Sequence, residues 1–485
     1  MSGAPAAPVR IQRTQPSGET KRATETMQAM PTLHASAASQ ANEASEADEA
    51  NEANEANEAN EANEAAGTQA MLARRARLLG PAYRLFYQEP LHLVRGEGVW
   101  LVDAHGRRYL DAYNNVAAVG HCHPHVVAAI ARQAATLNTH TRYLHDGILD
   151  YAERLLGTMP AALGHLMLTC TGSEANDLAL RIAAAHTGGN GLVITRFAYH
   201  GVTAALAEAS PSLGTQVRLG SHVRTVPAPD PRLPPEQVGP AFARGVRAAI
   251  AELQASGLRP AALLVDTVFS SDGILTDPPG FLAEAVDAMR AAGGLFIADE
   301  VQPGLGRTGE AMWGFLRHGV VPDLVTMGKP MGNGHPLAGV AVRPEVMAAF
   351  GSQCRYFNTF GGNPVAVAAG MAVLDVIEGE GLMANALRVG AYLRARLDDL
   401  ARLHPAIGDV RGAGLFTGVE LLGTDAARAP DSAAAARVVN AMRRRGVLVS
   451  SAGEHGNVLK IRPPLVFGEA HADLLVEALA AALEA

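Results

Sequence analysis

Apolar residues along most of this chain follow two alternating patterns. From about residue 125 onward, stretches with apolar residues at helical spacing alternate with short, continuously apolar stretches, which are typical of buried strands. The stretches with helical spacing are Val126–Leu137, Asn176–Ala185, Pro240–Ala255 and Phe281–Ala292. The strand candidates are Leu192–Ile194, Ala262–Val265, Leu295–Ala298 and Leu324–Thr326. This alternation predicts an α/β layer built on a largely parallel, buried sheet.

The pattern changes on both sides of this layer. Before it, Val99–Val102 and Arg108–Leu110 predict two strands joined by a turn. After it, the chain predicts a smaller C-terminal α/β domain with elements at Val365–Ile377, Leu387–Leu400, Leu415–Leu421, Leu459–Ile461 and Ala470–Leu483. We therefore expect four parts: a tail over residues 1–66, an N-terminal segment over 67–130, a large domain over 131–364 and a small domain over 365–485.

The tail has a composition of its own. Residues 42–65 form eight three-residue units, NEA, SEA, DEA and then NEA five times. A period of three matches neither a helix nor a strand with one buried face, and this repeat has no aliphatic side chain larger than alanine. We therefore expect residues 1–66 to be disordered. The first forty residues resemble a transit peptide in their Arg, Ser and Thr content, but prolines interrupt them, which favours a dispensable tail.

Charge and cysteine content exclude several classes of function. The tail holds four of the 40 basic residues and eleven of the 48 acidic residues, which leaves 36 and 37 for residues 67–485. A nearly neutral chain gives no reason to expect nucleic acid or a membrane as partner. No apolar run is close to the length of a membrane-spanning helix, which is about 18 residues. Three widely spaced cysteines give no disulfide framework, so the cytoplasm is the expected compartment.

A candidate phosphate site lies at Thr171-Gly172-Ser173-Glu174, just before a stretch of helical spacing. Thr171 and Glu174 fit a capping box at a helix start. The Gly-Ser turn would direct free backbone N–H groups and the positive end of the helix at one point, where a phosphate can bind. Alone this signal is weak, because most capped helix starts bind nothing.

Two further candidates follow predicted strands. Asp299 comes directly after Leu295–Ala298, where a carboxylate can pair with a protonated ring nitrogen or simply cap a turn. Lys329 lies in the glycine-rich segment Gly328–Gly334 in apolar surroundings. Burial lowers the pKa of a lysine and favours the free amine that forms an imine. A surface lysine is the ordinary alternative.

The order of the three candidates indicates one chemistry. A phosphate-binding helix start, an aspartate at a strand end and a lysine about thirty residues later form the arrangement that pyridoxal phosphate (PLP) requires. The phosphate anchors the cofactor, the carboxylate holds the ring nitrogen and the lysine binds the aldehyde.

With these motifs in place, the chain resembles the class III (subgroup II) aminotransferases of PLP fold type I from about residue 80 to the C-terminus. The motifs that carry the resemblance are LDAYNNVAAVGHCHP, TGSEAN, AYHG, FIADEVQPGLGRTG, TMGKPMGNGHP, YFNTFGGNP and LKIRPPL. The sequences of these motifs are most similar to those of the branch that contains alanine–glyoxylate aminotransferases and phospho-lyases acting on phosphoethanolamine or phosphohydroxylysine. The resemblance implies a large domain with a mostly parallel seven-stranded sheet and a smaller C-terminal α/β domain.

The resemblance also implies roles for the matching cofactor residues. Gly172 and Ser173 would hold the phosphate by backbone and hydroxyl groups. Tyr199 would stack on the pyridine ring, and the neighbouring His200 belongs to the same cofactor-binding set.

The remaining cofactor residues complete the catalytic set. Asp299 would bind the ring nitrogen, Gln302 the phenolic oxygen, and Lys329 would be the Schiff-base lysine. Thr359 would reach the phosphate in the neighbouring subunit of a homodimer.

The resemblance also implies a residue that binds the substrate. Arg462 would bind a substrate carboxylate, because a guanidinium forms paired hydrogen bonds with a carboxylate. The chain departs from the family pattern at two other positions that concern the substrate. Family members that use glutamate often have arginine where this chain has Val202, which leaves the keto-acid partner open. Asp266 replaces the family glutamate and could pair with Arg462 as a gate, with a reach one methylene shorter.

These expectations lead to an aminotransferase that moves an amino group from an amine or amino acid to a keto acid through Lys329. A phospho-lyase that eliminates phosphate from a phosphorylated amino compound is the main alternative, and a non-catalytic binding protein on the same fold is the second. We expect no metal site at His121, Cys122 and His123, since adjacent residues give no chelating face.

Overall fold

The computed structural model describes residues 67–485, so the expectations for the 1–66 tail lie outside the described residues. The chain divides into two units, Met1–Arg84 and Leu85–Ala485. The described part of the first unit consists of a helix over residues 67–79 and the segment after it. No helix within residues 67–485 is both long enough and apolar enough to cross a membrane.

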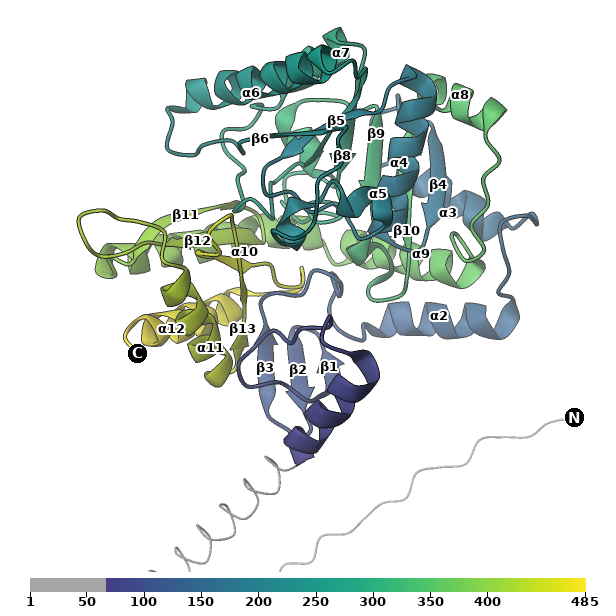
Figure 1. Ribbon diagram of the computed structural model, residues 1–485. Coiled ribbons are helices and arrows are strands. Elements are labelled where there is room, and N and C mark those ends of the chain that lie inside the picture. The colour runs from purple at the N-terminus through teal and green to yellow at the C-terminus, as the bar shows by residue number, and fades with distance from the viewer. Residues whose placement is uncertain (1–66) are drawn as a thin grey trace, which may run out of the picture. The chain divides into compact units, whose positions relative to one another are not determined.

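A seven-stranded sheet forms the centre of the second unit (Figure 1). Its order is β4 (His165–Thr169), β10 (Ala338–Val342), β9 (Leu324–Met327), β8 (Leu295–Asp299), β7 (Pro260–Asp266), β5 (Gly191–Thr195) and β6 (Val223–Val226). Strands β9, β8, β7, β5 and β6 run parallel to one another, whereas β10 is antiparallel to both of its neighbours. The predicted, mostly parallel seven-stranded sheet is therefore confirmed.

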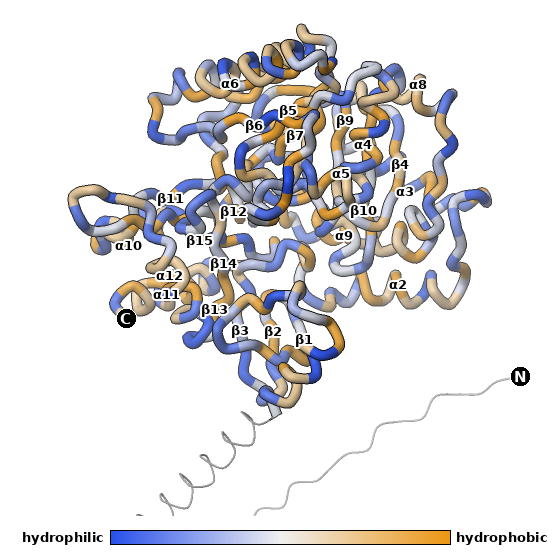
Figure 2. Tube along the Cα trace, viewed as in Figure 1, coloured by the Kyte–Doolittle hydropathy of each residue, from blue (hydrophilic) through white to orange (hydrophobic). Residues whose placement is uncertain are grey.

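Helices cover both faces of this sheet. One face packs on α4 (Gly172–Thr187) and α8 (Pro344–Gln353), and the other on α6 (Pro235–Ala255), α7 (Ala283–Ala291) and α9 (Pro364–Gly379). Neighbouring strand residues alternate between the two cores, as with Phe296 and Ile297 of β8. Because both faces are buried, the inner strands are mostly apolar, as Figure 2 shows for the central strands. This explains the continuous apolar runs in the sequence.

Two smaller sheets flank the large one. Strands β11 (Ile407–Ala413), β12 (Phe416–Leu421), β15 (Val458–Ile461) and β14 (Ser450–Ala452) form an antiparallel sheet near the C-terminus. Helices α10 (Leu382–Leu403), α11 (Ser432–Arg444) and α12 (Glu469–Leu483) pack around it. The expected smaller C-terminal α/β domain is confirmed.

The third sheet joins the two ends of the unit. Strands β1 (Leu93–Glu97), β2 (Trp100–Asp103) and β3 (Arg108–Asp111) are antiparallel, and β13 (Val447–Leu448) adds to β3 in parallel. The remaining elements are α2 (Pro124–Thr136), α3 (Asp146–Leu156), α5 (Ala204–Ala207), η1 (Pro211–Leu213), η2 (Gly314–His318) and η3 (Lys329–Gly332). The exact boundaries expected between the parts, at residues 130 and 364, stay predictions.

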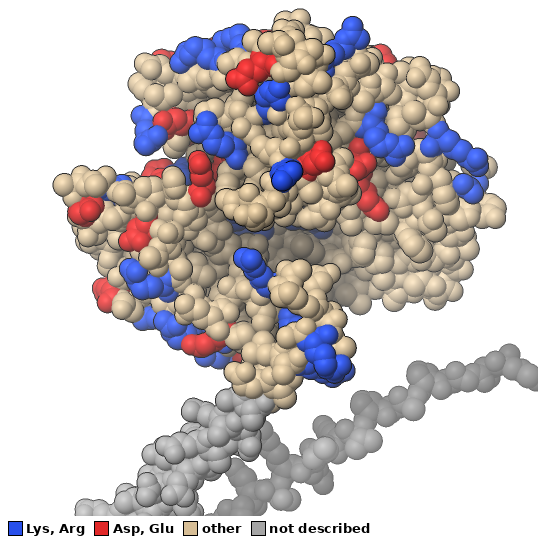
Figure 3. Space-filling model, in the orientation of Figure 1, with Lys and Arg blue, Asp and Glu red and all other residues tan. Residues whose placement is uncertain are grey.

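Charged side chains of both signs are interspersed over the face drawn in Figure 3. No extended patch of one sign covers that face, in keeping with the nearly equal numbers of basic and acidic residues.

Candidate active site

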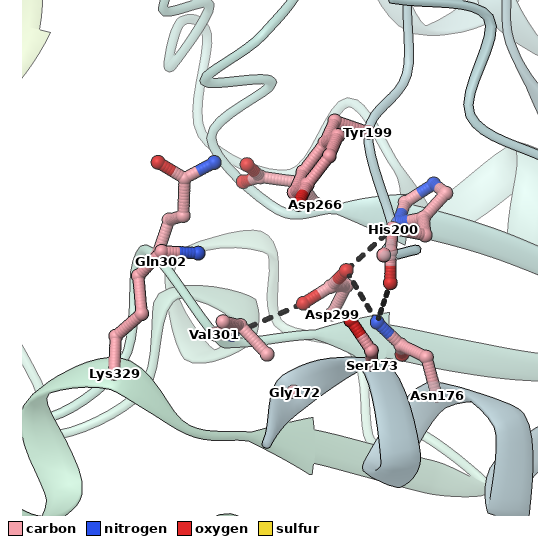
Figure 4. Close-up of a pocket in the computed structure, with 11 residues that line it drawn as sticks. Gly172, Ser173, Asn176, Tyr199, His200, Asp266, Asp299, Val301, Gln302 and Lys329 are labelled. Atoms are coloured by element: carbon pink, nitrogen blue, oxygen red, sulfur yellow. Dashed lines mark hydrogen bonds and ion pairs between the residues drawn. The ribbon is translucent and has the colours of Figure 1, made fainter. Parts of the chain in front are cut away.

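One cavity lies where strands β5, β7, β8 and β9 end, at the carboxyl edge of the large sheet (Figure 4). The open space between its lining residues, including the part that is continuous with solvent, is about 420 Å³. Its lining is formed by Gly172, Ser173, Asn176, Tyr199, His200, Gly201, Asp266, Asp299, Val301, Gln302 and Lys329. In parallel sheets of this kind, ligands bind at the carboxyl ends of the strands. Eight of the ten predicted site residues are thus brought together, and Thr359 and Arg462 are not part of this lining.

The start of helix α4 forms one wall of the cavity. The Thr171 hydroxyl accepts the N–H of Glu174 at 3.1 Å, and the Glu174 carboxylate accepts the N–H of Thr171 at 3.1 Å, so the predicted capping box is present. The box leaves the N–H groups of Gly172 and Ser173 at the positive end of the helix. A small anion can bind there.

Glycine at position 172 permits close packing of this helix start. A Cβ atom on Gly172 would lie 2.9 Å from Cγ2 of Val301, the second residue after β8. The turn before Lys329 also lies close to the helix start, because a Cβ atom on Gly328 would lie 3.2 Å from the Gly172 nitrogen. The anion-binding turn, the strand end and the lysine loop therefore share one compact site.

Asp299 is fixed at the floor of the cavity. Its Oδ2 atom lies 2.7 Å from Nδ1 of His200 and accepts a hydrogen bond of 2.9 Å from Nδ2 of Asn176. Its Oδ1 atom accepts the N–H of Val301 at 3.1 Å. Asn176 is held in turn by the Thr326 hydroxyl, which donates to its Oδ1 at 2.6 Å. The buried carboxylate is thus held in one orientation.

His200 and Tyr199 close the side of the cavity opposite Gln302 in Figure 4. Nε2 of His200 is buried and has no hydrogen-bond partner among the described residues. Burial, followed by the Asp299 charge, raises the pKa of Tyr199, so its phenol stays neutral.

Lys329 is the second residue after β9 and has a backbone φ of 34°. Left-handed backbone is rare for a residue with a side chain, and it concentrates at functional sites. Part of the residue is open to the cavity, yet burial, followed by the charge of Arg462, lowers the pKa of Lys329 to about 8. The desolvation expected from the apolar surroundings of Lys329 is therefore present.

Asp266 and Arg462 do not form the expected gate pair in this structure. Asp266 accepts the N–H groups of Val268 and Ser270, at 3.0 and 3.2 Å, and the Ser270 hydroxyl. Arg462 is buried and donates to the carbonyl oxygen of Tyr113 and to Oε1 of Gln302. The shorter aspartate therefore folds back on its own loop instead of reaching the guanidinium.

The other predicted residues lie outside the cavity lining. Thr359 is exposed in the loop between α8 and α9. Val202 is 63% exposed, and its N–H donates to the Ser173 hydroxyl at 3.2 Å, which places it beside the anion-binding turn.

The histidines near Cys122 have protein partners. Nε2 of His121 lies 2.7 Å from Asp111, and Nε2 of His123 lies 3.0 Å from Glu380. Within residues 67–485, no group of three or more His, Cys, Asp or Glu side chains could hold a metal ion.

Sequence reasoning missed Asn176 and Val301, which both line the cavity. Asn176 lies one helical turn after Ser173, so the period of the helix was a signal that it faces the same way. Val301 stands two residues after Asp299, but no residue pattern distinguishes it from a core valine.

Comparison with known proteins identifies the family. The family model named aminotransferase class-III matches residues 86–483. An alanine–glyoxylate aminotransferase 2-like protein of Drosophila melanogaster is 42% identical over 413 residues, which cover 82% of this chain and 84% of that protein.

Two solved structures are similar over most of their length. A phospholyase from Arthrobacter in complex with phosphoethanolamine has a TM-score of 0.83 and 48% identity, covering 86% of this chain and 99% of that one. An amine transaminase from an uncultivated Pseudomonas species, solved in the PLP-bound form, has a TM-score of 0.76 and 30% identity, covering 82% and 95%. With its fold, its cavity and these relatives, the chain belongs to the class III aminotransferase family and is a PLP-dependent enzyme.

Proposed function

We propose that this enzyme moves an amino group from an amine or amino acid to a keto acid, with Lys329 as the residue that binds the cofactor covalently. One observation carries the proposal. Lys329, Asp299 and the free N–H groups of Gly172 and Ser173 all open into a single cavity of about 420 Å³.

The residues of the cavity fit PLP. The N–H groups of Gly172 and Ser173 would hold its phosphate, and the Asp299 carboxylate would accept a hydrogen bond from the ring nitrogen. The ring of Tyr199 offers a stacking surface. Gln302 would reach the phenolic oxygen.

When bound, PLP supplies an aldehyde that bonds to amines and a ring that accepts electrons from the substrate carbon. A substrate amine would take the place of the Lys329 amine on that aldehyde. Nζ of Lys329, freed in this way, would accept the proton from the substrate Cα, a role that suits an amine whose pKa burial lowers to about 8. The Asp299 carboxylate would lie beside the ring nitrogen. With the keto acid, Lys329 would return a proton to the same carbon.

We assign substrate binding to Arg462 and Asp266. Three N–H groups of Arg462 are used by Tyr113 and Gln302, which leaves two of its five donors for a substrate carboxylate. Val202 offers no charge for a second carboxylate, so monocarboxylic keto acids are the expected acceptors.

We further propose a homodimer in which Thr359 of one subunit reaches the cofactor phosphate of the other. The exposure of Thr359 outside its own cavity supports this arrangement. The loops around it also expose apolar side chains, notably Phe360 at 70% and Leu144 at 99%. Large exposed apolar side chains commonly mark protein interfaces.

A phospho-lyase is the second candidate function. The observation that favours it is the 48% identity with the Arthrobacter phospholyase. The two activities share the proton abstraction by Lys329 and differ in the next step, because a lyase expels a phosphate from the neighbouring carbon.

Product analysis separates the two functions. Purified holoenzyme is incubated with a panel of amines and amino acids, each with pyruvate, glyoxylate or 2-oxoglutarate, and with phosphoethanolamine without any keto acid. The proposal expects amino transfer to a keto acid. Release of inorganic phosphate without an acceptor, together with no amino transfer across the panel, would establish the lyase instead.

We propose the cytoplasm as the compartment. The three cysteines, Cys122, Cys170 and Cys354, are all free, as expected in a reducing environment. Cell fractionation tests this, and recovery of the enzyme in a membrane-bounded compartment would contradict it.

A further inference from the structure

Strand β15 brings a second lysine close to the active site. The sequence contains only three lysines, Lys21, Lys329 and Lys460, although it has 40 basic residues. Of the two lysines in residues 67–485, Lys329 lines the cavity and Lys460 lies two residues before Arg462. Arginine stays charged at physiological pH, whereas a buried lysine can release its proton.

Lys460 lies in β15, and Arg462 is the first residue after this strand; both side chains are buried. The two residues are 8% and 4% exposed. Across the sheet, Lys460 lies opposite Gly418 of β12 and Ser450 of β14, two small residues that leave room for its side chain.

Neither cation has an acidic partner in the described part of the chain. No carboxylate of residues 67–485 lies within ion-pair distance of Lys460 or Arg462. Asp266, whose charge acts on both residues, accepts the N–H groups of Val268 and Ser270. A buried cation without a counter-charge is costly, so an anion supplied from outside would stabilise both groups.

Lys460 lies two residues before Arg462, whose guanidinium donates to Oε1 of Gln302 in the cavity lining. The Lys460 ammonium interacts electrostatically with Arg462, Asp266, Lys329 and Asp272. Asp266 and Lys329 belong to the cavity lining. An anionic group of a substrate held at Lys329 would therefore come within reach of both Lys460 and Arg462.

We propose that Lys460 is a substrate-binding residue. Together with Arg462 it forms a two-cation subsite for the anionic group of the substrate amine. A doubly charged phosphate or phosphonate fits this subsite better than a carboxylate. The proposal rests on the proposed cofactor site at Lys329, but not on whether amino transfer or elimination occurs there. Each cation interacts with both charges of a dianion, so a dianion gains more than a carboxylate.

Two pKa shifts support a site in which the bound anion supplies the negative charge that keeps Lys460 protonated. Burial lowers the pKa of Lys460 to about 7, and burial and the Asp299 charge raise the pKa of Asp266. Near pH 8 most of the free holoenzyme therefore carries a neutral Lys460. Its neighbours are the cation Arg462, the acids Asp266 and Asp272, and the Lys329 amine that binds the cofactor. A bound dianion favours the ammonium form, so binding should take up a proton.

The test compares two amines that differ only in their anionic end. Holoenzyme is titrated calorimetrically near pH 8 with 2-aminoethylphosphonate, whose C–P bond elimination does not break, and with β-alanine. In Lys460→Met we expect affinity for the phosphonate to fall about tenfold or more and affinity for β-alanine to fall less than about threefold. Lys460→Arg should restore phosphonate affinity to within about threefold.

Proton uptake supplies a readout that a structural role would not change. Repeating the phosphonate titration in buffers of different ionisation enthalpy should reveal uptake by the wild type and much less by Lys460→Arg, because arginine is already charged. The comparison of wild type with Lys460→Arg tests the proposal even if Lys460→Met does not fold. Equal phosphonate affinity of wild type and Lys460→Met, or unchanged uptake in Lys460→Arg, would overturn the proposal. Failure to form a holoenzyme at all would instead count against the proposed function.

Discussion

Oδ2 of Asp299 lies 2.7 Å from Nδ1 of His200, and both side chains are almost fully buried. Asn176 donates to the same oxygen, so the carboxylate cannot rotate without losing two contacts. A carboxylate fixed in this way is suited to hold a ring nitrogen in its protonated form.

Asp299→Asn should lower turnover by about 100-fold or more, while the fold is retained. The amide keeps the shape of the carboxylate but removes the charge that opposes loss of the ring proton, and single electrostatic groups in active sites contribute about that much. Steady-state kinetics with the best amine substrate measures the effect. Asn176→Ala, which removes one contact to Asp299, is the matched control and should cost about tenfold at most. Equal activity of Asp299→Asn and wild type would exclude the assigned role.

Gly172→Ala should weaken cofactor binding by about tenfold or more, which corresponds to about 1.4 kcal/mol. The added Cβ atom would meet Val301 at 2.9 Å and displace the N–H groups that would hold the phosphate. Equilibrium dialysis of apoenzyme against PLP measures the affinity. Gly379→Ala is the control, because a Cβ atom there meets nothing within 4 Å. If the two variants bind PLP equally well, the helix start does not hold the phosphate.

Reconstitution of the apoenzyme should depend on pH through Lys329. Only the unprotonated amine attacks an aldehyde, and burial lowers the pKa of Lys329 to about 8 from its ordinary value of 10.5. The rate of covalent cofactor attachment should therefore rise with pH and level off above about 8. Stopped-flow absorbance monitors the reaction. A rate that continues to rise toward pH 10 would show that Lys329 has the pKa of an exposed lysine.

Val202→Arg should allow 2-oxoglutarate to serve as amino acceptor. Val202 is exposed beside the anion-binding turn, where the family members that use glutamate often carry arginine. The new guanidinium can pair with the second carboxylate of the acceptor, so kcat/KM for 2-oxoglutarate should rise about tenfold relative to pyruvate. Val202→Leu changes size without charge and should have no such effect. An unchanged preference in the arginine variant would mean that this position does not face the acceptor.

Mixing two inactive variants tests the proposed contribution of Thr359 across a dimer interface. After subunit exchange, a heterodimer of Lys329→Ala and Thr359→Ala would contain one site with both native residues and one with neither. Activity should therefore return to about a quarter of the wild-type value if half of the dimers are mixed. If Thr359 acts within its own subunit, every site stays defective and mixing restores nothing.

The sequence predicted the inner strands of the large sheet better than its edge. Strands β7 and β8 are buried on both faces, so their composition is mostly apolar and stands out. The edge strand β4 is only half-buried, and β10 consists of alanine, glycine and valine, so neither gave a distinct signal. The antiparallel direction of β10 depends on how the chain returns to the sheet, which no local pattern encodes.

The same distinction applies to the site. Lys329 and Asp299 could be found because each lies at the end of a strand, and the position of a strand end can be derived from local composition. Asn176 contacts a residue 123 positions later in the chain, so its role depends on tertiary packing. Lys460 was overlooked because one lysine within an apolar strand is not distinctive until Arg462 and the cavity are seen beside it.

The central claim is that Lys329 holds the cofactor, and one measurement tests it directly. Holoenzyme is treated with borohydride, which reduces the bond between lysine and PLP to a stable one, and is then digested and analysed by mass spectrometry. Because the chain has only three lysines, each candidate peptide can be monitored separately. We expect the cofactor mass on the peptide containing Lys329, and its loss in Lys329→Ala. Attachment to Lys460, or no attachment in an enzyme that still turns over, would contradict it.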